Sequence, residues 1–225
     1  MPLFIGIGAL VILLAVGGLA YMAASRTPHA TTPDGLAHGS LIYEAKLTAA
    51  AWSSGGAPAP VPPTSASVAY GASSIDMRIL KDGASFDGEF DAPALKEYVA
   101  HLVLKVDTGS DFELDWRVRG SGPSEAADVG LNIQVAQEVM TLYLSPNSGS
   151  NQALAASIPV QGLQGGRVVD IGLVVKGTSI SLFLDGTRVA LASETQSTGA
   201  ATPGFYMDGK SGALHILSLR YYALP

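Results

Sequence analysis

The segment DFELDWRVR, Asp111–Arg119, alternates strictly between apolar and charged side chains. Successive side chains of a β-strand point to opposite faces, so this period of two residues separates the two kinds. The apolar set is Phe112, Leu114, Trp116 and Val118, and the charged set is Glu113, Asp115, Arg117 and Arg119. The segment therefore predicts a half-buried strand, with Trp116 in the core and a face of mixed charge in water.

Strand signals recur at short intervals on both sides of this segment, from Val68 to the C-terminus. The expected strands are Ile75–Leu80, Ser85–Phe90, Tyr98–Val106, Val129–Ala136, Val139–Ser145, Arg167–Gly177 and Ala213–Leu224. Lys81–Gly83 predicts a hairpin-type turn, and the Asp185-Gly186 pair within Thr178–Ala192 predicts a tight primed turn. Many strands with short turns and no competing amphipathic helix indicate a β-sandwich or a barrel.

The order of these segments resembles the concanavalin A-like lectin/glucanase sandwich. DFELDWRVR is followed by VGLNIQV (Val129–Val135), by VVDIGLVVKGTSISLFLDGTRV (Val168–Val189) and by PGFYMDGKSGALHILSLRYY (Pro203–Tyr222). The resemblance covers about Ser110–Leu224 and is closest to laminin-G-like and family-16-related domains of bacterial surface proteins. It implies an all-β antiparallel sandwich, or jelly roll, with Phe205 and Tyr206 in a strand and Asp208–Gly212 in a turn.

The N-terminal end has a different character. Leu3–Ala24 carries no charge, and its 22 residues would span about 33 Å as a helix, enough for the hydrocarbon core of a bilayer. A cleaved signal peptide is the alternative, but no basic residue precedes the apolar run. We expect a transmembrane helix over 1–25, a Pro/Gly-rich linker over 26–67 with a first strand at 40–48, and the sandwich over 68–225.

Small residues on the expected helix favour close packing against another helix. Ala20 and Ala24 have small-xxx-small spacing, and Gly17 and Gly18 lie one turn earlier. Arg26 favours a cytoplasmic domain by the positive-inside tendency, whereas the family resemblance favours an extracytoplasmic one. We predict a single-pass protein of the bacterial inner membrane with its β domain outside the cytoplasm.

Composition excludes several classes of function. The formal net charge is -6, the pI is about 5.1 and no window is rich in Lys or Arg, so a nucleic acid is not an expected partner. The absence of cysteine excludes thiol catalysis and thiolate metal sites. The sequence predicts no cofactor and no resident metal.

The charged face of Asp111–Arg119 contains half of a catalytic pattern. Glu113-Leu114-Asp115 resembles the start of the family-16 glycosidase motif E-x-D-x-x-E. Retaining hydrolysis needs a second carboxyl as acid/base, and Arg117 and Val118 stand where it should be. We therefore predict no enzyme activity and interpret the segment as an exposed strand face of mixed charge.

Other constellations are weaker. Gly204–Ser211 matches G-x-x-x-x-G-K-S, but its Phe, Tyr and Met and the strand that follows do not suit a phosphate loop. The four histidines His29, His38, His101 and His215 lack metal-ligand spacing. The acidic residues Asp76, Asp82, Asp87, Glu89 and Asp91 are expected to keep a loop soluble, with oxygen ligation of calcium as the alternative. The candidate sugar-stacking or interface aromatics are Trp52, Trp116, Tyr143, Tyr221 and Tyr222.

Three functions fit these observations. The first is a non-catalytic accessory subunit of a bacterial membrane complex, held by the helix among its partners and in the lipid bilayer; a photosynthetic reaction-centre or antenna complex is the example we consider. The second is a surface carbohydrate-binding module, which the fold resemblance favours. The third is a glycoside hydrolase, which the missing second glutamate disfavours. The sequence alone favours the first.

Overall fold

The computed structural model describes residues 30–31, 36–48, 65–71, 73–120, 127–146, 150–197 and 199–225. The expected transmembrane helix over 1–25, with Ala20, Ala24, Gly17 and Gly18, lies outside these residues, as do His29 and Trp52. In the part of the chain that is described, no helix has the length and apolar character to cross a membrane. The chain divides into two compact units, Met1–Ala30 and Thr31–Pro225, and the second is described below.

The described residues form β-strands joined by turns. In chain order the strands are β1 (Ala30–Thr31), β2 (Ala37–His38), β3 (Leu41–Glu44), β4 (Ala66–Tyr70), β5 (Ile75–Ile79), β6 (Ala84–Glu89), β7 (Tyr98–Val106), β8 (Asp111–Arg119), β9 (Ala127–Gln134), β10 (Val139–Pro146), β11 (Gln152–Pro159), β12 (Val168–Lys176), β13 (Ser179–Leu184), β14 (Thr187–Ser193) and β15 (Gly204–Tyr222).

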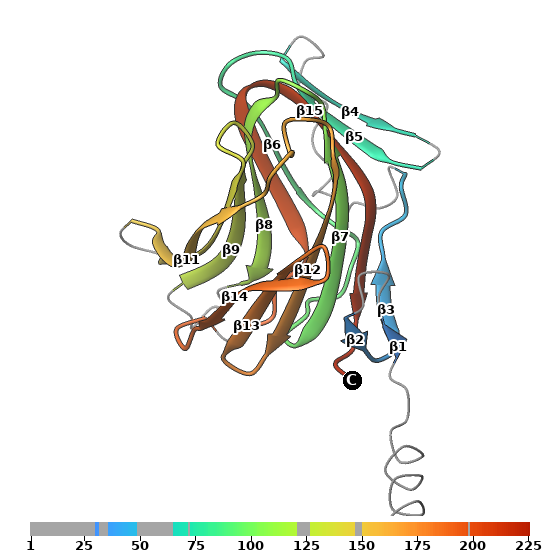
Figure 1. The fold of residues 1–225 in the computed structure, drawn as a ribbon. Helices are drawn as coiled ribbons and strands as arrows, with labels where there is room; N and C mark the ends of the chain where they lie inside the picture. The colour runs from blue at the N-terminus through green and yellow to red at the C-terminus, as the bar shows by residue number, and fades with distance from the viewer. Residues whose placement is uncertain are drawn as a thin grey trace, which may run out of the picture. The chain divides into compact units, whose positions relative to one another are not determined.

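The strands build two antiparallel layers that share β15 (Figure 1). One layer, here called the β8 sheet, has the order β6-β15-β8-β9-β10-β11. The other, the β7 sheet, has the order β4-β5-β15-β7-β12-β13-β14, and β3 pairs with the end of β15. The predicted all-β antiparallel fold is confirmed.

A bend in β15 lets one strand serve both layers. Gly204–Gly209 pairs with β6 and Gly212–Ile216 with β5, so the strand crosses between the sheets at Gly209–Gly212. A Cβ at Gly209 would lie 2.5 Å from the Cα of Phe112, so a larger residue would not allow this close approach. The turn predicted at Asp208–Gly212 is therefore wrong, because the strand bends there without ending.

The two predicted turns have different outcomes. Lys81–Gly83 joins β5 in the β7 sheet to β6 in the β8 sheet, so the hairpin expected there is wrong. The two strands pair with different halves of β15 and not with each other. Asp185-Gly186 does join the antiparallel pair β13–β14, with φ of 47° and 76°. Positive φ at both positions is what a type I′ turn requires, so this prediction is confirmed.

The core lies between the sheets and consists of the inward side chains of both. Trp116 is fully buried, as predicted, and its Nε1 donates to the hydroxyl of Tyr221 at 2.8 Å. The hydroxyl of Tyr98 donates to the carbonyl of Val118 at 2.6 Å. Tyr221 and Tyr222 are both buried, so neither is an exposed stacking residue.

A second, smaller apolar cluster lies on the outer face of the β7 sheet. Leu36, Val99 and Tyr222 form it, and all three are buried. Leu36 precedes β2, and β3 pairs with Arg220–Tyr222 of β15. Residues within the segment expected to be linker thus pack on the sandwich, because the end of β15 offers a free edge for β3.

Candidate functional site

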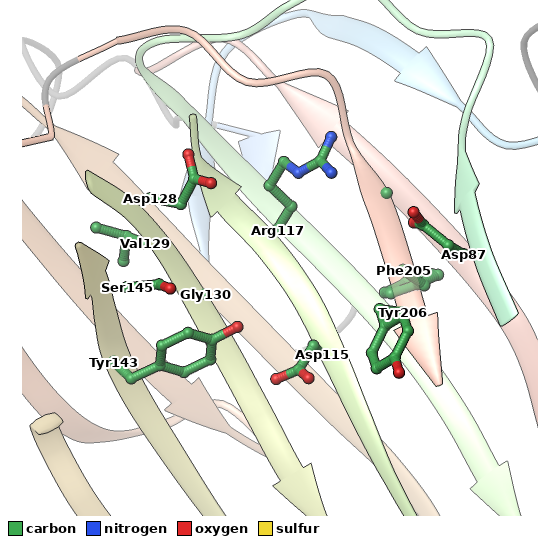
Figure 2. Close-up of a pocket in the computed structure, with 11 residues that line it drawn as sticks. Asp87, Asp115, Arg117, Asp128, Val129, Gly130, Tyr143, Ser145, Phe205 and Tyr206 are labelled. Atoms are coloured by element: carbon green, nitrogen blue, oxygen red, sulfur yellow. The ribbon is translucent and has the colours of Figure 1, made fainter. Parts of the chain in front are cut away.

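The outer face of the β8 sheet is hollowed in two adjoining places. The first hollow, of about 210 Å³, is lined by side chains of β6, β15, β8, β9 and β10 (Figure 2). The second, of about 270 Å³, continues across β8, β9 and β10 to residues 151 and 153. Asp115 and Tyr143 line both hollows and join them into one trough.

Strand alternation and register place these side chains together. Asp115 of β8 lies opposite Asn132 of β9 on one side and Tyr206 of β15 on the other. Thr141 and Tyr143 of β10 pair with Asn132 and Gly130 of β9. The polar face of DFELDWRVR thereby becomes the floor of the trough, since its apolar face is used by the core.

One buried amide ties two carboxylates together at the centre of the trough. Nδ2 of Asn132 donates to Oε2 of Glu113 at 3.1 Å and to Oδ1 of Asp115 at 3.0 Å. Because both oxygens lie about 3 Å from the same nitrogen, they are no more than about 6 Å apart. The Asn132 side chain thus connects the two carboxylates through one amide nitrogen.

Asp115 has an unusual electrostatic environment. Burial is the main cause that raises the pKa of its carboxyl, and the negative charges of Glu113 and Asp208 raise it further. Hydrogen bonds from Asn132 and Tyr143 oppose this rise. Burial and the neighbouring Asp115 also raise the pKa of Tyr143, so its hydroxyl keeps its proton and donates to Asp115.

Tyr143 lies directly over a glycine. A Cβ on Gly130 would stand 2.5 Å from Cζ and from the hydroxyl of Tyr143. The ring can lie this close to the sheet only because position 130 has no side chain. In Figure 2 the Tyr143 ring extends across β9 with its hydroxyl toward Asp115. Tyr143, a stacking candidate from the sequence, thus lies in the trough.

Arg117 occupies the other end of the β8 segment. Its Nη1 donates to Oε1 of Glu89 on β6, which forms an ion pair between partly exposed side chains. Val118, the next residue, is fully buried in the core. Counted from Glu113, the second glutamate of E-x-D-x-x-E falls at Val118, which is buried in the core beside the paired Arg117.

Arg119 is not on the outer face, and this part of the sequence prediction is wrong. It is 1% exposed, and its guanidinium donates to the carbonyls of Ser197 and Gly177. An irregularity in the pairing of β8 with β9 lies between Arg117 and Arg119. A β-bulge of this kind interrupts the two-residue alternation, which is why the charged side chain turns inward.

The histidines considered as metal ligands from the sequence lie outside the trough where they are described. His215 lies between Asp76 and Asp107, at 2.8 Å and 3.0 Å, on the β7 sheet. His101 is buried, with Nε2 2.6 Å from Oδ1 of Asp170. The described residues contain no group of three or more His, Asp or Glu side chains arranged for a metal.

The acidic stretch and the phosphate-loop match are divided among strands. Asp76 is on β5 of the β7 sheet, whereas Asp87 is on β6 and lines the first hollow. Gly204–Ser211 lies within β15 and is strand throughout. Lys210 forms an exposed ion pair with Asp111 at 2.9 Å. Among the described residues, the acidic stretch is thus divided between two sheets and does not form a single calcium loop. Gly204–Ser211 forms a strand and not a phosphate loop.

Four further residues that line the trough were not predicted as site residues, namely Asp128, Gly130, Asn132 and Tyr206. VGLNIQV carried a usable signal, because an asparagine and a glycine interrupt its apolar residues on the face opposite Val129, Leu131 and Ile133. Those three residues are buried in the core. This local pattern does not show which strands lie beside β9. The contacts of Asn132 and Tyr143 with Asp115 were therefore not predicted.

Comparison with known proteins identifies the fold. No protein-family model matches the chain, and no curated protein matches its sequence. Among solved structures, a Bacillus subtilis protein of unknown function with a galectin-like fold is similar at a TM-score of 0.61, with 9% identity over 82% of this chain and 96% of that one. The laminarinase catalytic domain from Thermotoga maritima gives 0.57, with 9% identity over 82% and 98%.

A third similar structure is the carbohydrate-binding module CBM66 from Bacillus subtilis. Its TM-score is 0.51, with 12% identity over 69% of this chain and 92% of the module. At such low identity the three likenesses show the fold alone, which catalytic and non-catalytic proteins share. The concanavalin A-like lectin/glucanase sandwich predicted from the sequence is confirmed.

Proposed function

We propose that the outer face of the β8 sheet binds carbohydrate. The observation that carries this proposal is the Tyr143 ring, which lies over Gly130 beside the Glu113–Asn132–Asp115 cluster. Sugars present apolar C–H faces and many hydroxyl groups. An aromatic ring suits the first, and carboxylate and amide groups suit the second. The likeness to a carbohydrate-binding module and to a laminarinase domain supports a glycan as the ligand.

We further propose that binding is not followed by hydrolysis. A retaining glycosidase places the reacting bond between two carboxyls about 5–5.5 Å apart. Here Glu113 and Asp115 belong to the first half of the pattern, both accept from the amide of Asn132, and no second catalytic glutamate follows them on β8. The position of the missing acid/base is taken by Val118, which is buried, and the preceding Arg117 is paired with Glu89. We therefore propose that the protein has no glycosidase activity. Measurable hydrolysis of a glycan would contradict this.

The accessory-subunit function stays a prediction. It rests on the segment 1–25, with Ala20, Ala24, Gly17 and Gly18, which lies outside the described residues. The described face favours the carbohydrate-binding alternative instead. The two are compatible in one molecule, because an anchored sandwich would hold its glycan-binding face near the bacterial inner membrane, outside the cytoplasm.

The test is binding of full-length protein, in mild detergent, to a panel of soluble glycans by isothermal titration calorimetry. We expect Tyr143→Ala to weaken binding at least tenfold, since an aromatic–sugar contact of about 1.5 kcal/mol corresponds to that factor. Gly130→Ala should do the same by displacing the ring while leaving Tyr143 in the chain.

Ser181→Ala on β13, in the other sheet, is the matched control and should bind like the wild type. Absence of binding to every glycan would refute the proposal, as would unchanged affinity of both the Tyr143 and the Gly130 variants. Release of reducing sugar by the wild type, lost in Glu113→Gln, would refute the non-catalytic part alone.

A further inference from the structure

β14 (Thr187–Ser193) forms one edge of the β7 sheet and leaves apolar side chains in water. Among the described strands it pairs with β13 only. Leu191 is 61% exposed and Val189 is 37% exposed. An extended edge with exposed apolar side chains is a template for pairing with another chain, which proteins usually prevent with charges, prolines, bulges or short strands.

Three other edge strands of the described sheets carry such protection. β11 shifts its register with β10 twice, includes Ser157 at a φ of 59° and ends in Pro159. β6 carries Asp87 and Glu89. β4 has only five residues. β14 is longer than β4 and β6, has no proline or carboxylate, and carries one cation, Arg188.

The pairing with β13 fixes which backbone groups of β14 face the open edge. The N–H of Glu194 donates to the carbonyl of Thr178 at 2.8 Å. Because the residues of an antiparallel pair bond alternately, Ala192 also bonds to β13, whereas the N–H and C=O of Leu191 point away from it. The bulge of β14 lies beside Val189, nearer the turn, so this stretch pairs regularly.

The edge is self-complementary about Leu191. In a second β14 placed antiparallel about a two-fold axis at this residue, the two Leu191 backbones would exchange N–H···O=C bonds, with Cα atoms about 5.5 Å apart. Their side chains would cover each other on one face of the sheet. Arg188 lies three residues from the axis, so the two cations would be about 20 Å apart and their repulsion screened by salt.

We infer that β14 is an interface between two copies of this chain, which join their β7 sheets into one continuous sheet by antiparallel pairing about Leu191. A two-fold axis of this kind runs perpendicular to the sheet, so both β8 sheets lie on the same side of the dimer. The two troughs then open toward one surface. This consequence for ligand binding rests on the proposed carbohydrate binding, whereas the dimer itself does not.

Single cysteines test the contact directly, because the chain has no cysteine of its own. Full-length Leu191→Cys in mild detergent is oxidised and analysed on a non-reducing gel. Cysteines with Cα atoms about 4.4–6.8 Å apart can form a disulfide, so we expect a cross-linked dimer. Val168→Cys is the matched control, because Val168 is 49% exposed on the same sheet but β12 is paired on both sides. Cross-linking of the Leu191 variant no faster than that of the control would overturn the inference.

Opposite charges at the axis test the pairing without a cross-link. Leu191→Asp and Leu191→Lys should each prevent association through β14, because like charges would face each other at about 5.5 Å. An equimolar mixture of the two variants should restore it, measured by energy transfer between differently labelled full-length chains. Any association through residues 1–25 would be the same in all three samples. Equal energy transfer in all three would overturn the inference.

Glycan binding is measured separately from the dimer. Leu191→Asp should bind a soluble glycan like the wild type but a glycan-coated surface at least about tenfold more weakly, because one trough then acts alone. An unchanged affinity for the surface would overturn the placement of both troughs on one side. Cross-linking of Leu191→Cys without binding to any glycan would refute carbohydrate binding and leave the dimer standing.

Discussion

The two sheets are built from strands of the same kind, but their outer faces have different surroundings. On the β8 sheet the outward residues are polar and line an open trough, with Asn132 connecting Glu113 and Asp115. On the β7 sheet the outward Val99 packs with Leu36 and with its cross-strand neighbour Tyr222 in a second apolar cluster. One outer face is therefore available to a ligand, and the other is partly covered by the chain's own N-terminal residues.

This difference shows that a side chain on a strand can be buried for two physical reasons. Leu114 of β8 is buried because the opposite sheet covers it, whereas Val99 of β7 is buried because a segment from outside the sheets covers it. Strand alternation detects only the first kind. The β7 strand YVAHLVLKV is apolar on both sides, which is typical of a strand covered on both faces.

The largest contrast should come from matched charge substitutions on the two outer faces. Val99→Asp places an unpaired carboxylate in a fully buried cluster and should lower the free energy of unfolding by about 3–5 kcal/mol. Thr141→Asp, on the open trough, should lower it by less than about 1 kcal/mol. Urea unfolding followed by tryptophan fluorescence measures both. Equal losses would show that the covering of Val99 contributes nothing to stability.

A smaller effect should appear in the pH dependence of the β7 sheet. Burial alone would lower the pKa of His215, but hydrogen bonds to Asp76 and Asp107 raise it. Burial alone would raise the pKa of Asp76, but hydrogen bonds from His215 and Ser74 lower it. The raised histidine pKa contributes stability below about pH 6.5 that is lost as pH rises through the folded-state pKa.

The lowered pKa of Asp76 acts with the opposite sign, because its stability contribution is present above about pH 4 and is lost on acidification. The cluster should therefore stabilise most between about pH 4 and 6.5. His215→Gln should reduce the free energy of unfolding by about 1 kcal/mol at pH 5 and by clearly less at pH 8.5, since partly exposed ion pairs are worth little. An equal loss at both pH values would contradict the charge-based account.

The smallest effect concerns the centre of the trough. Asn132→Ala removes the amide that favours the ionised form of Asp115, so the pKa of Asp115 should rise further. Tyr143→Phe should raise the same pKa by a smaller amount, since the Asn132 hydrogen bond opposes the rise more strongly. Carboxyl-carbon NMR titration of the wild type and both variants would show this order. A fall in the pKa of Asp115 in either variant would mean that the hydrogen bonds are misassigned.

Prediction from sequence succeeded where the physics is local. The predicted bounds of β7, Tyr98–Val106, and of β8, Asp111–Arg119, coincide with the observed strands. Both segments are long and have strong strand patterns, so their type does not depend on distant contacts. The Asp185-Gly186 turn was also predictable, because the two residues that need positive φ tolerate it.

Prediction failed where pairing partners are far apart in the chain. β11 was not predicted, because QALAASIP has little alternation and takes its strand form through pairing with β10. The Lys81–Gly83 connection looked like a hairpin because the choice of β15 as partner on both sides is invisible locally. Arg119 looked exposed because a bulge cannot be read from alternation.

By itself, the amino-acid sequence determined the long alternating strands such as β8 and which side of DFELDWRVR enters the core; the concanavalin A-like sandwich was expected from the resemblance to that family. The strands and their buried side follow from side-chain chemistry repeating every two residues. Only the tertiary structure decided that Asn132, Tyr143 and Gly130 converge on Asp115, and that Arg119 is buried. Register, bulges and the crossing of β15 between sheets set those contacts. They depend on hydrogen bonds between strands distant in sequence, whose partners no local pattern specifies.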